Sequence, residues 1–329
     1  MCRVTKSIYG YDLLKFLMAV MIVSIHSNAF EYLSLSPYFN IIQLMGVPTF
    51  FLLSSFFFMK KLHVNGPQWS LLLSFIKRIG IMYMIWFVIN LPVLYLQNRV
   101  HWTLWTFLKD LIFGGVFDGA WFLSALVVSV TLIFLLIKFR VPAFFIGLLC
   151  VVIYLCIYKG GLNWISLIST YETYCFKPIT LSFPRALIWI FWGYVLSSPQ
   201  VLSKMDRLSQ MNKKHLLVCL LCISIFFMER FLDTMPYHLL LIVSVPLLCI
   251  YFYGLNLHES KGWKFLRDCS ILFYLIHFIV LIFLRQIPYI QDLQGLSKWG
   301  VCLLIVSFIS SFILYLEKTP CGKYLRYLH

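Results

Sequence analysis

Two ionisable side chains share one face of the first apolar stretch of this chain. Lys15 and His26 are eleven residues apart, which is close to three helical turns, so a helix at ~1.5 Å per residue stacks them about 16 Å apart. Asp12 precedes Lys15 by three residues and can reach its ammonium group. A lysine at the centre of a bilayer costs roughly 3 kcal/mol, so ionisable groups in a membrane span suggest function. This stripe is the first candidate for chemistry.

His26 has the chemistry of a proton acceptor at neutral pH. A positioned general base of this kind is worth roughly 10²–10⁴ in rate. A histidine can also act as a nucleophile that carries a transferred group, and the residues alone do not separate the two roles. The structural alternative is a histidine that is hydrogen-bonded to a neighbouring helix.

The composition indicates that these residues lie in a membrane. Of 329 residues, 61% are hydrophobic and 12% are charged, which fits a bundle of membrane-spanning helices rather than a water-soluble domain. The net charge of +15 comes from Lys and Arg in short loops, so we expect a lipid bilayer and no nucleic acid as partner. Cys219 and Cys222 form a C-x-x-C without a second pair inside an apolar run, so no metal site is expected.

The predicted fold class is an all-α membrane protein with about ten transmembrane helices. A span needs about 20 residues to cross the ~30 Å hydrocarbon core. The predicted spans are residues 9–29, 39–59, 76–96, 119–138, 141–158, 183–198, 214–232, 236–255, 269–286 and 298–316. They form one integral-membrane domain over residues 1–329. The stretch 101–117 is interrupted by charges and glycines, so we expect an interfacial or re-entrant segment there.

Lys and Arg are concentrated in alternate loops, on the side that also carries both termini. The positive-inside rule therefore predicts that both termini are cytoplasmic. One polar group then lies toward the cytoplasm and consists of Asp12, Lys15, Ser54, Ser55, Lys77 and Arg78. The other lies at mid-depth or toward the outside and consists of His26, Trp121, Arg185, Tyr274 and His277. This division suits a reaction between a cytoplasmic donor and an external acceptor.

Five short motifs occur in order along the chain. They are Asp12 and Lys15 with His26 after ten further residues, VPTFFLLSSF at 47–56, FIKRIGIMY at 75–83, AWFL at 120–123 and SILFYLIH at 270–277. Together they resemble the integral-membrane acyltransferase-3 family, whose members O-acylate cell-envelope sugars. Lys15 stands where the family usually has Arg, Ser55 where it has Gly, and Ile81 where it has a second basic residue. Lysine lacks the planar fork with which arginine holds a phosphate or carboxylate in two places.

The resemblance implies a membrane O-acyltransferase in the bacterial plasma membrane. An acyl group, most simply acetyl, would pass from cytoplasmic acyl-CoA to a hydroxyl of a cell-surface polysaccharide, lipopolysaccharide or lipid-linked sugar precursor. His26 would be the catalytic residue, which either takes the proton of the hydroxyl that attacks the acyl donor or accepts the acyl group itself as a covalent relay. The cytoplasmic polar group would bind the donor. The other members of the outer group would bind the acceptor or line the site. Acyl-CoA is a substrate, so we expect no permanently bound cofactor, and no appended soluble domain.

Each binding role has a structural alternative. Lys15, Lys77 and Arg78 could anchor helices at the cytoplasmic interface, and Ser54 and Ser55 could permit a close helix contact.

The outer residues have alternatives as well. Trp121 and Arg185 could belong to the interfacial belt, while Tyr274 and His277 could form a buried hydrogen-bonded network. For the whole chain, the alternatives are a catalytically inactive family member and a transporter or flippase for a lipid-linked glycan. Transporters commonly have two repeated halves, and no internal repeat is evident here.

Overall fold

A computed structural model describes residues 8–158, 165–175, 178–210, 214–231, 235–291 and 293–329. Every regular element in these ranges is a helix, which confirms the predicted all-α class.

The helices follow one another with short connections. The first six are α1 (Tyr9–His26), α2 (Ser36–Leu44), α3 (Gly46–Asn65), α4 (Trp69–Leu96), α5 (Leu104–Phe113) and α6 (Ala120–Lys138). The middle of the chain forms α7 (Ala143–Tyr158), α8 (Ile165–Cys175), the 3-10 helix η1 (Ile179–Leu181), α9 (Phe183–Leu196), α10 (Pro199–Gln210) and α11 (Lys214–Arg230). The last part forms α12 (Met235–Tyr253), α13 (Lys261–Leu284), α14 (Pro288–Gln291), α15 (Gly295–Leu316) and the 3-10 helix η2 (Cys321–Leu328).

Each of the ten predicted spans overlaps a helix, with 39–59 covering parts of both α2 and α3, but fewer segments have the length and apolarity of a full crossing. Six such segments lie within the described residues: Tyr9–His26, Ser36–Asn65, Trp69–Leu96, Ala120–Lys138, Lys261–Leu284 and Gly295–Leu316. A seventh results if α9 and α10, which are bent by 74° at the break between them, form one interrupted span. The structure thus shows several membrane helices, and the count of ten and the side of the termini remain predictions.

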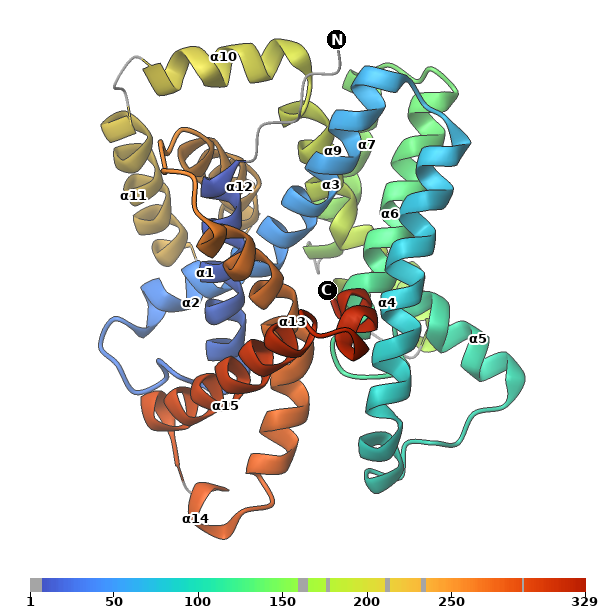
Figure 1. Cartoon of the computed structure of the whole chain (residues 1–329). Helices are drawn as coiled ribbons and strands as arrows, with labels where there is room; N and C mark the ends of the chain where they lie inside the picture. Colours follow the sequence, from blue (N-terminus) through green and yellow to red (C-terminus); the bar gives the residue numbers. More distant parts are fainter. Residues whose placement is uncertain (1–7, 159–164, 176–177, 211–213, 232–234, 292) are drawn as a thin grey trace.

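The helix α1 lies inside the bundle, where it packs against α13, α3, α12 and α2. A second packing centre is α9, which contacts α3, α6 and α7. Figure 1 shows α10 across one end of the bundle and α14 at the opposite end. The C-terminal helix η2 reaches the middle of the bundle, where it packs against α4 and α15 (Figure 1). The interior is therefore built around α1 and its neighbours.

The segment between α4 and α6 forms the short helix α5, because capping residues define where it begins and where it ends. Thr103 accepts a hydrogen bond from the backbone of Thr106, and the side chain of Thr106 accepts one from the backbone of Thr103. Gly114 ends the helix with a φ of +76°, a conformation that favours glycine. At ten residues α5 is too short to cross a bilayer, in agreement with the prediction for 101–117.

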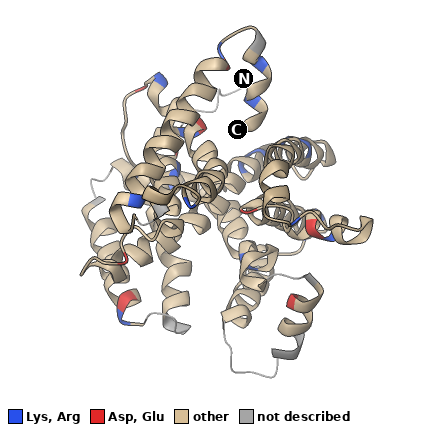
Figure 2. Ribbon diagram, turned by 90° about the horizontal axis from the view of Figure 1, so that it is seen from below, with Lys and Arg blue, Asp and Glu red and all other residues tan. Residues whose placement is uncertain are grey.

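Charged side chains are sparse in this structure. Figure 2 shows them as separate short patches on a ribbon that consists mostly of other residue types. Asp12 and Asp268 stand out because both carboxyl groups are buried between helices. A buried charge is costly unless it is paired, so these two positions direct attention to the interface between α1 and α13.

Candidate active site

His26, at the end of α1, faces the middle of α13. Its ring centre lies 5.1 Å from that of His277 and 4.6 Å from that of Phe278. The His26 side chain is exposed, whereas His277 is completely buried. The Nδ1 atom of His277 lies 2.9 Å from the carbonyl oxygen of Phe273, one turn earlier on α13. The structure therefore brings together two histidines from the first and last motifs, one of them accessible.

A turn before α6 packs against α13 beside this pair of histidines. The hydroxyl of Tyr274 donates a hydrogen bond of 3.1 Å to the carbonyl oxygen of Gly119, which has a φ of +87°. A Cβ atom at Gly119 would lie 2.9 Å from the ring of Phe278, so a larger residue does not fit there without a shift. Asp118 in the same turn forms a 3.1 Å ion pair with Arg99. Tyr274 thus holds the turn next to His26.

Trp121 belongs to an aromatic cluster that continues from this turn into the bundle. Its ring centre is 6.0 Å from that of Phe51, which lies 4.5 Å from Phe122. Phe122 in turn lies 5.1 Å from Tyr274. Trp121 is buried within this cluster and does not lie in an exposed interfacial belt.

The cytoplasmic part of α1 carries a second group of ionisable residues. The charges of Asp12, Lys15, Arg78, Arg267 and Asp268 act on one another in the structure. The Nζ atom of Lys15 also lies 5.2 Å from the centre of the Phe57 ring. We call these five residues the cation cluster, because three of its members are cations. Asp12, Lys15 and Arg78 of the predicted donor group thus lie near one another, together with two residues from α13, and their role as a donor site stays a prediction.

Arg267 and Asp268 have no role in the predicted site. The Nε atom of Arg267 lies 3.2 Å from Oδ1 of Asp268, and both precede the motif that ends in His277. In the sequence they form a charged pair just before that motif, and such a pair is equally typical of a cytoplasmic loop next to a membrane helix. Their place beside Lys15 depends on the packing of α13 on α1.

The C-terminal segment also reaches Asp268 of the cation cluster. The Nε2 atom of His329 lies 3.0 Å from Oε2 of Glu317, and its Nδ1 atom lies 3.8 Å from Oδ1 of Asp268. Leu328 is buried, and its carbonyl oxygen accepts a 3.0 Å hydrogen bond from the indole of Trp86. The end of η2 is thus attached to α4, α13 and α15.

Both groups of ionisable residues lie along a single helix pair. Lys15 and His26 are eleven residues apart on α1, while their partners Arg267 and His277 are ten residues apart on α13. The two helices therefore run in the same direction, with matching positions separated by about 15 Å at ~1.5 Å per residue. Between the two groups, the ring centres of Phe16 and Phe273 are 5.4 Å apart.

Three other residues that were predicted to bind the donor lie outside the cation cluster. Ser55 is completely buried, its hydroxyl donates to the carbonyl of Leu52 at 2.9 Å, and it packs against Gly193 of α9. This position supports the packing alternative for Ser55. Ser54, its neighbour, is half-buried, and Lys77 is exposed beside an apolar groove between α4, α5 and α6.

Arg185, predicted to lie near the acceptor, belongs to another part of the structure. Its Nη1 atom donates a 3.1 Å hydrogen bond to the carbonyl of Thr180, and its charge acts on Tyr154 and Tyr158 of α7. Arg185 therefore joins α9 to η1 and α7 in the described structure.

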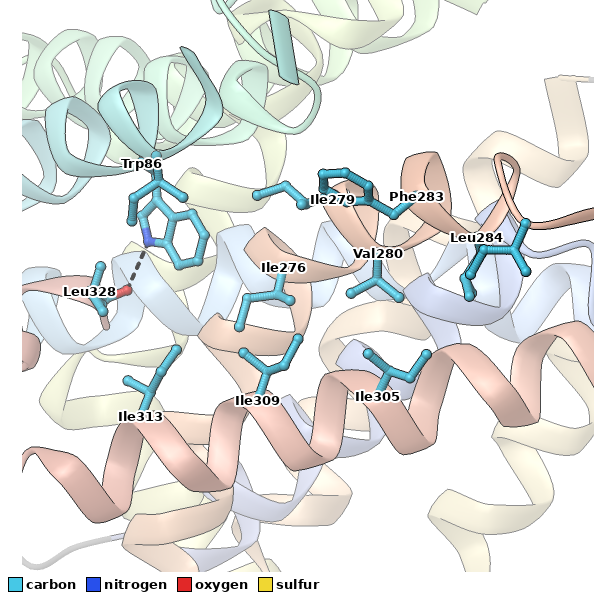
Figure 3. Close-up of a pocket in the computed structure, with 12 residues that line it drawn as sticks. Trp86, Ile276, Ile279, Val280, Phe283, Leu284, Ile305, Ile309, Ile313 and Leu328 are labelled. Carbon is cyan, nitrogen blue, oxygen red and sulfur yellow. Dashed lines mark hydrogen bonds between the residues drawn. The ribbon is translucent and has the colours of Figure 1, made fainter. Parts of the chain in front are cut away.

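An apolar cavity of about 420 Å³ lies on the adjacent face of α13 (Figure 3). Ile276 and Val280 of α13, Ile309 of α15 and Trp86 of α4 contribute to its wall. Leu328 closes one end, where Figure 3 shows its bond to Trp86. The cavity has no charged lining residue, so it is distinct from both groups of ionisable residues.

Comparison with known proteins gives one family and two distant relatives. A family model described as an acyltransferase domain matches residues 8–316. An amino-acid racemase of Enterococcus faecalis is 23% identical over 331 residues, which cover 93% of this chain and 45% of the relative. Another protein of that name and organism is 24% identical over 208 residues, which cover 59% of this chain and 29% of the relative.

The chain spans less than half the length of these curated relatives. No solved structure matches. The family model, by contrast, covers nearly the whole chain, including all five motifs and the His26–His277 pair. The chain belongs to the acyltransferase-3 family.

Proposed function

We propose that this membrane acyltransferase moves an acyl group, most simply acetyl, from cytoplasmic acyl-CoA to an external hydroxyl. The acceptor is a cell-surface polysaccharide, lipopolysaccharide or lipid-linked sugar precursor, and the site of action is the bacterial plasma membrane. The observation that carries the proposal is the placement of the cation cluster and the exposed His26 along one pair of parallel helices.

The separation of the two groups matches the shape of the donor. The phosphates of coenzyme A are anions that a cluster with Lys15, Arg78 and Arg267 attracts. The pantetheine arm that joins the diphosphate to the sulfur has about twelve chain bonds, equivalent to about four extended residues or roughly 14 Å. A donor whose phosphates lie at the cation cluster can therefore present its thioester close to His26.

The reaction needs one proton acceptor at the thioester. The acceptor hydroxyl attacks the carbonyl carbon, the bond from carbon to sulfur breaks, and coenzyme A leaves as the thiolate. His26 takes the hydroxyl proton and gives it to the thiolate. Lys15 is too far from His26 to share this proton transfer, so its role is to bind the donor.

The proposal is tested by comparing surface glycans of four strains by mass spectrometry. A deletion strain is complemented with the wild type, with His26→Ala or with His101→Ala. His101 is a matched control because it is an exposed histidine in a loop outside both groups. We expect acetyl esters with the wild type and with His101→Ala, and their loss in the deletion strain and with His26→Ala.

Two outcomes would contradict the proposal. Identical acetyl content of every glycan in all four strains would exclude an O-acetyltransferase for those glycans. Loss of the surface glycan itself in the deletion strain, with unchanged acetylation of the glycan that remains in the cell, would favour the transporter or flippase.

A further inference from the structure

His277 is a buried titratable side chain whose hydrogen-bond geometry determines which of its two ring nitrogens carries the hydrogen. The side chain is completely buried, and Nδ1 lies 2.9 Å from the carbonyl oxygen of Phe273. A carbonyl only accepts hydrogen bonds, so Nδ1 carries the hydrogen. In the neutral ring, Nε2 then carries a lone pair and can only accept.

The accepting nitrogen of His277 has no hydrogen-bond partner among the described residues. An unsatisfied buried acceptor is uncommon and calls for an explanation. Phe278, whose ring centre is 4.0 Å away, offers no donor. His26 does, because its ring centre lies 5.1 Å from that of His277, with 32° between the ring planes. One N–H···N bond of about 3 Å can join two imidazoles at such a separation after a small side-chain rotation.

We propose that His277 is a positioning residue for His26. Nε2 of His277 accepts the hydrogen of one His26 nitrogen, which fixes the tautomer and the orientation of the His26 ring. The other His26 nitrogen then points its lone pair to the acceptor hydroxyl. This inference rests on the acyl transfer proposed above, and it assigns to a neutral histidine the orienting task that a carboxylate performs in hydrolase triads.

The proton balance of the step is complete with these two residues. When His26 takes the hydroxyl proton, it becomes an imidazolium whose second N–H remains bonded to His277. The proton then passes to the departing thiolate, and both histidines return to their starting forms. Of the charged groups around His26, Asp118 and Arg285 act on its charge from the turn before α6 and from the end of α13.

Two amide variants of His277 separate positioning from packing. In His277→Asn the amide nitrogen replaces Nδ1 and keeps the bond to Phe273, but nothing remains at the Nε2 position. In His277→Gln the amide oxygen can replace Nε2 as an acceptor, and the bond to Phe273 is lost. A positioning role therefore predicts that His277→Gln retains more function than His277→Asn, whereas a purely structural role predicts the reverse order.

The first measurement is incorporation of label from acetyl-CoA into glycan by membranes of the complemented strains. We expect kcat to fall about 30-fold in His277→Asn and less than fivefold in His277→Gln, with the KM for acetyl-CoA unchanged in both. The acid limb of the pH–rate profile should move in His277→Asn and stay in place in His277→Gln. Equal rates for the two variants, or a slower His277→Gln, would overturn the inference.

The second measurement does not depend on turnover. The purified full-length protein is treated with diethylpyrocarbonate, and the modification rate of His26 is followed by mass spectrometry. We expect a several-fold slower rate in His277→Asn than in the wild type and in His277→Gln, with the rate at His101 unchanged in all three. Equal rates at His26 would refute the positioning role. If the order holds while no protein transfers acetyl, the proposed function fails and the role of His277 in orienting His26 stands.

Discussion

Lys15 stands at the position where arginine is usual in the family. The charges of Asp12 and Asp268 act on it, and its Nζ atom lies 5.2 Å from the centre of the Phe57 ring. In the cation cluster the three cations outnumber the two carboxylates, so the group as a whole attracts an anion even though lysine lacks a bidentate fork. In the proposed function the whole cluster, rather than Lys15 alone, binds the donor.

We predict that Lys15→Arg retains activity and that Lys15→Ala raises the KM for acetyl-CoA about tenfold, the loss of one charge-assisted contact. The kcat should change little, because Lys15 does not contact the reacting carbonyl. Initial rates at varied acetyl-CoA concentration measure both constants. Lys61→Ala is the control, since it removes an exposed cation on the neighbouring helix end. Full affinity in Lys15→Ala would remove Lys15 from the donor site.

Arg267 provides an independent check of the cation cluster. We expect Arg267→Ala to weaken acetyl-CoA binding to a similar degree as Lys15→Ala. Because the two cations lie in one group, the double variant should lose less than the product of the single losses. Titration calorimetry with acetyl-CoA on the purified protein measures all four forms. Independent, multiplicative losses would show that the two residues do not share a ligand.

The sequence was sufficient to identify Lys15 and His26 as candidates for chemistry, but not to predict all of the residues that lie beside them. The spacing of Lys15 and His26 predicts a shared helix, and the structure places both on α1. The role of Arg267 could not be predicted, because it depends on the direction and register of α13 along α1. The placement of Arg185 depends similarly on contacts of α9 with α7 and η1.

At the crossing of α3 and α9, a small residue on one helix makes room for a side chain on the other that the family usually lacks. Ser55 replaces the usual glycine, and it is Gly193 on α9 that leaves room for it. A Cβ atom on Gly193 would meet the Ser55 hydroxyl and lie 2.9 Å from the carbonyl oxygen of Leu52. The two helices therefore approach as closely as small residues allow.

We predict that Gly193→Ala destabilises the protein by about 1–3 kcal/mol, the usual cost of an overpacked contact. Adding Ser55→Gly should recover part of that loss, because it removes one of the clashing atoms but not the backbone of α3. Thermal unfolding in detergent measures the three variants. Gly80→Ala is the matched control, since a Cβ atom there meets nothing within 4 Å. A wild-type melting temperature in Gly193→Ala would show that the helices are not in contact.

The arrangement of the whole molecule in the membrane can be tested at the two ends of α4. The positive-inside rule predicts that residue 68 is cytoplasmic and residue 97 external. Both glutamines at these positions are exposed. We expect a membrane-impermeant maleimide to label Gln97→Cys in intact cells and Gln68→Cys only after the membrane is opened. The reversed pattern would invert the predicted orientation, and labelling of both in intact cells would show that α4 does not cross.

Composition and periodicity were sufficient for the helical class and for the approximate place of the helices in the ten predicted spans, but the helices α8, α10 and α14 were not predicted. They were insufficient for the number of crossings, because α7 and α11 are too short to count on length alone and α9 bends sharply into α10. Hydropathy reports how apolar a segment is. It does not report whether neighbouring helices shield a segment that fails to reach across the bilayer.

The position of Phe16 and Phe273 has a consequence for the energetics of the cell. Their ring centres lie 5.4 Å apart between the cation cluster and the two histidines. In the proposed transfer, a thioester arm passes along this interface while the membrane keeps its proton gradient. We expect the two rings to limit the passage of protons between the two groups. Replacement of Phe273 by glycine should therefore make proteoliposomes leak protons, which a trapped pH-sensitive dye would report.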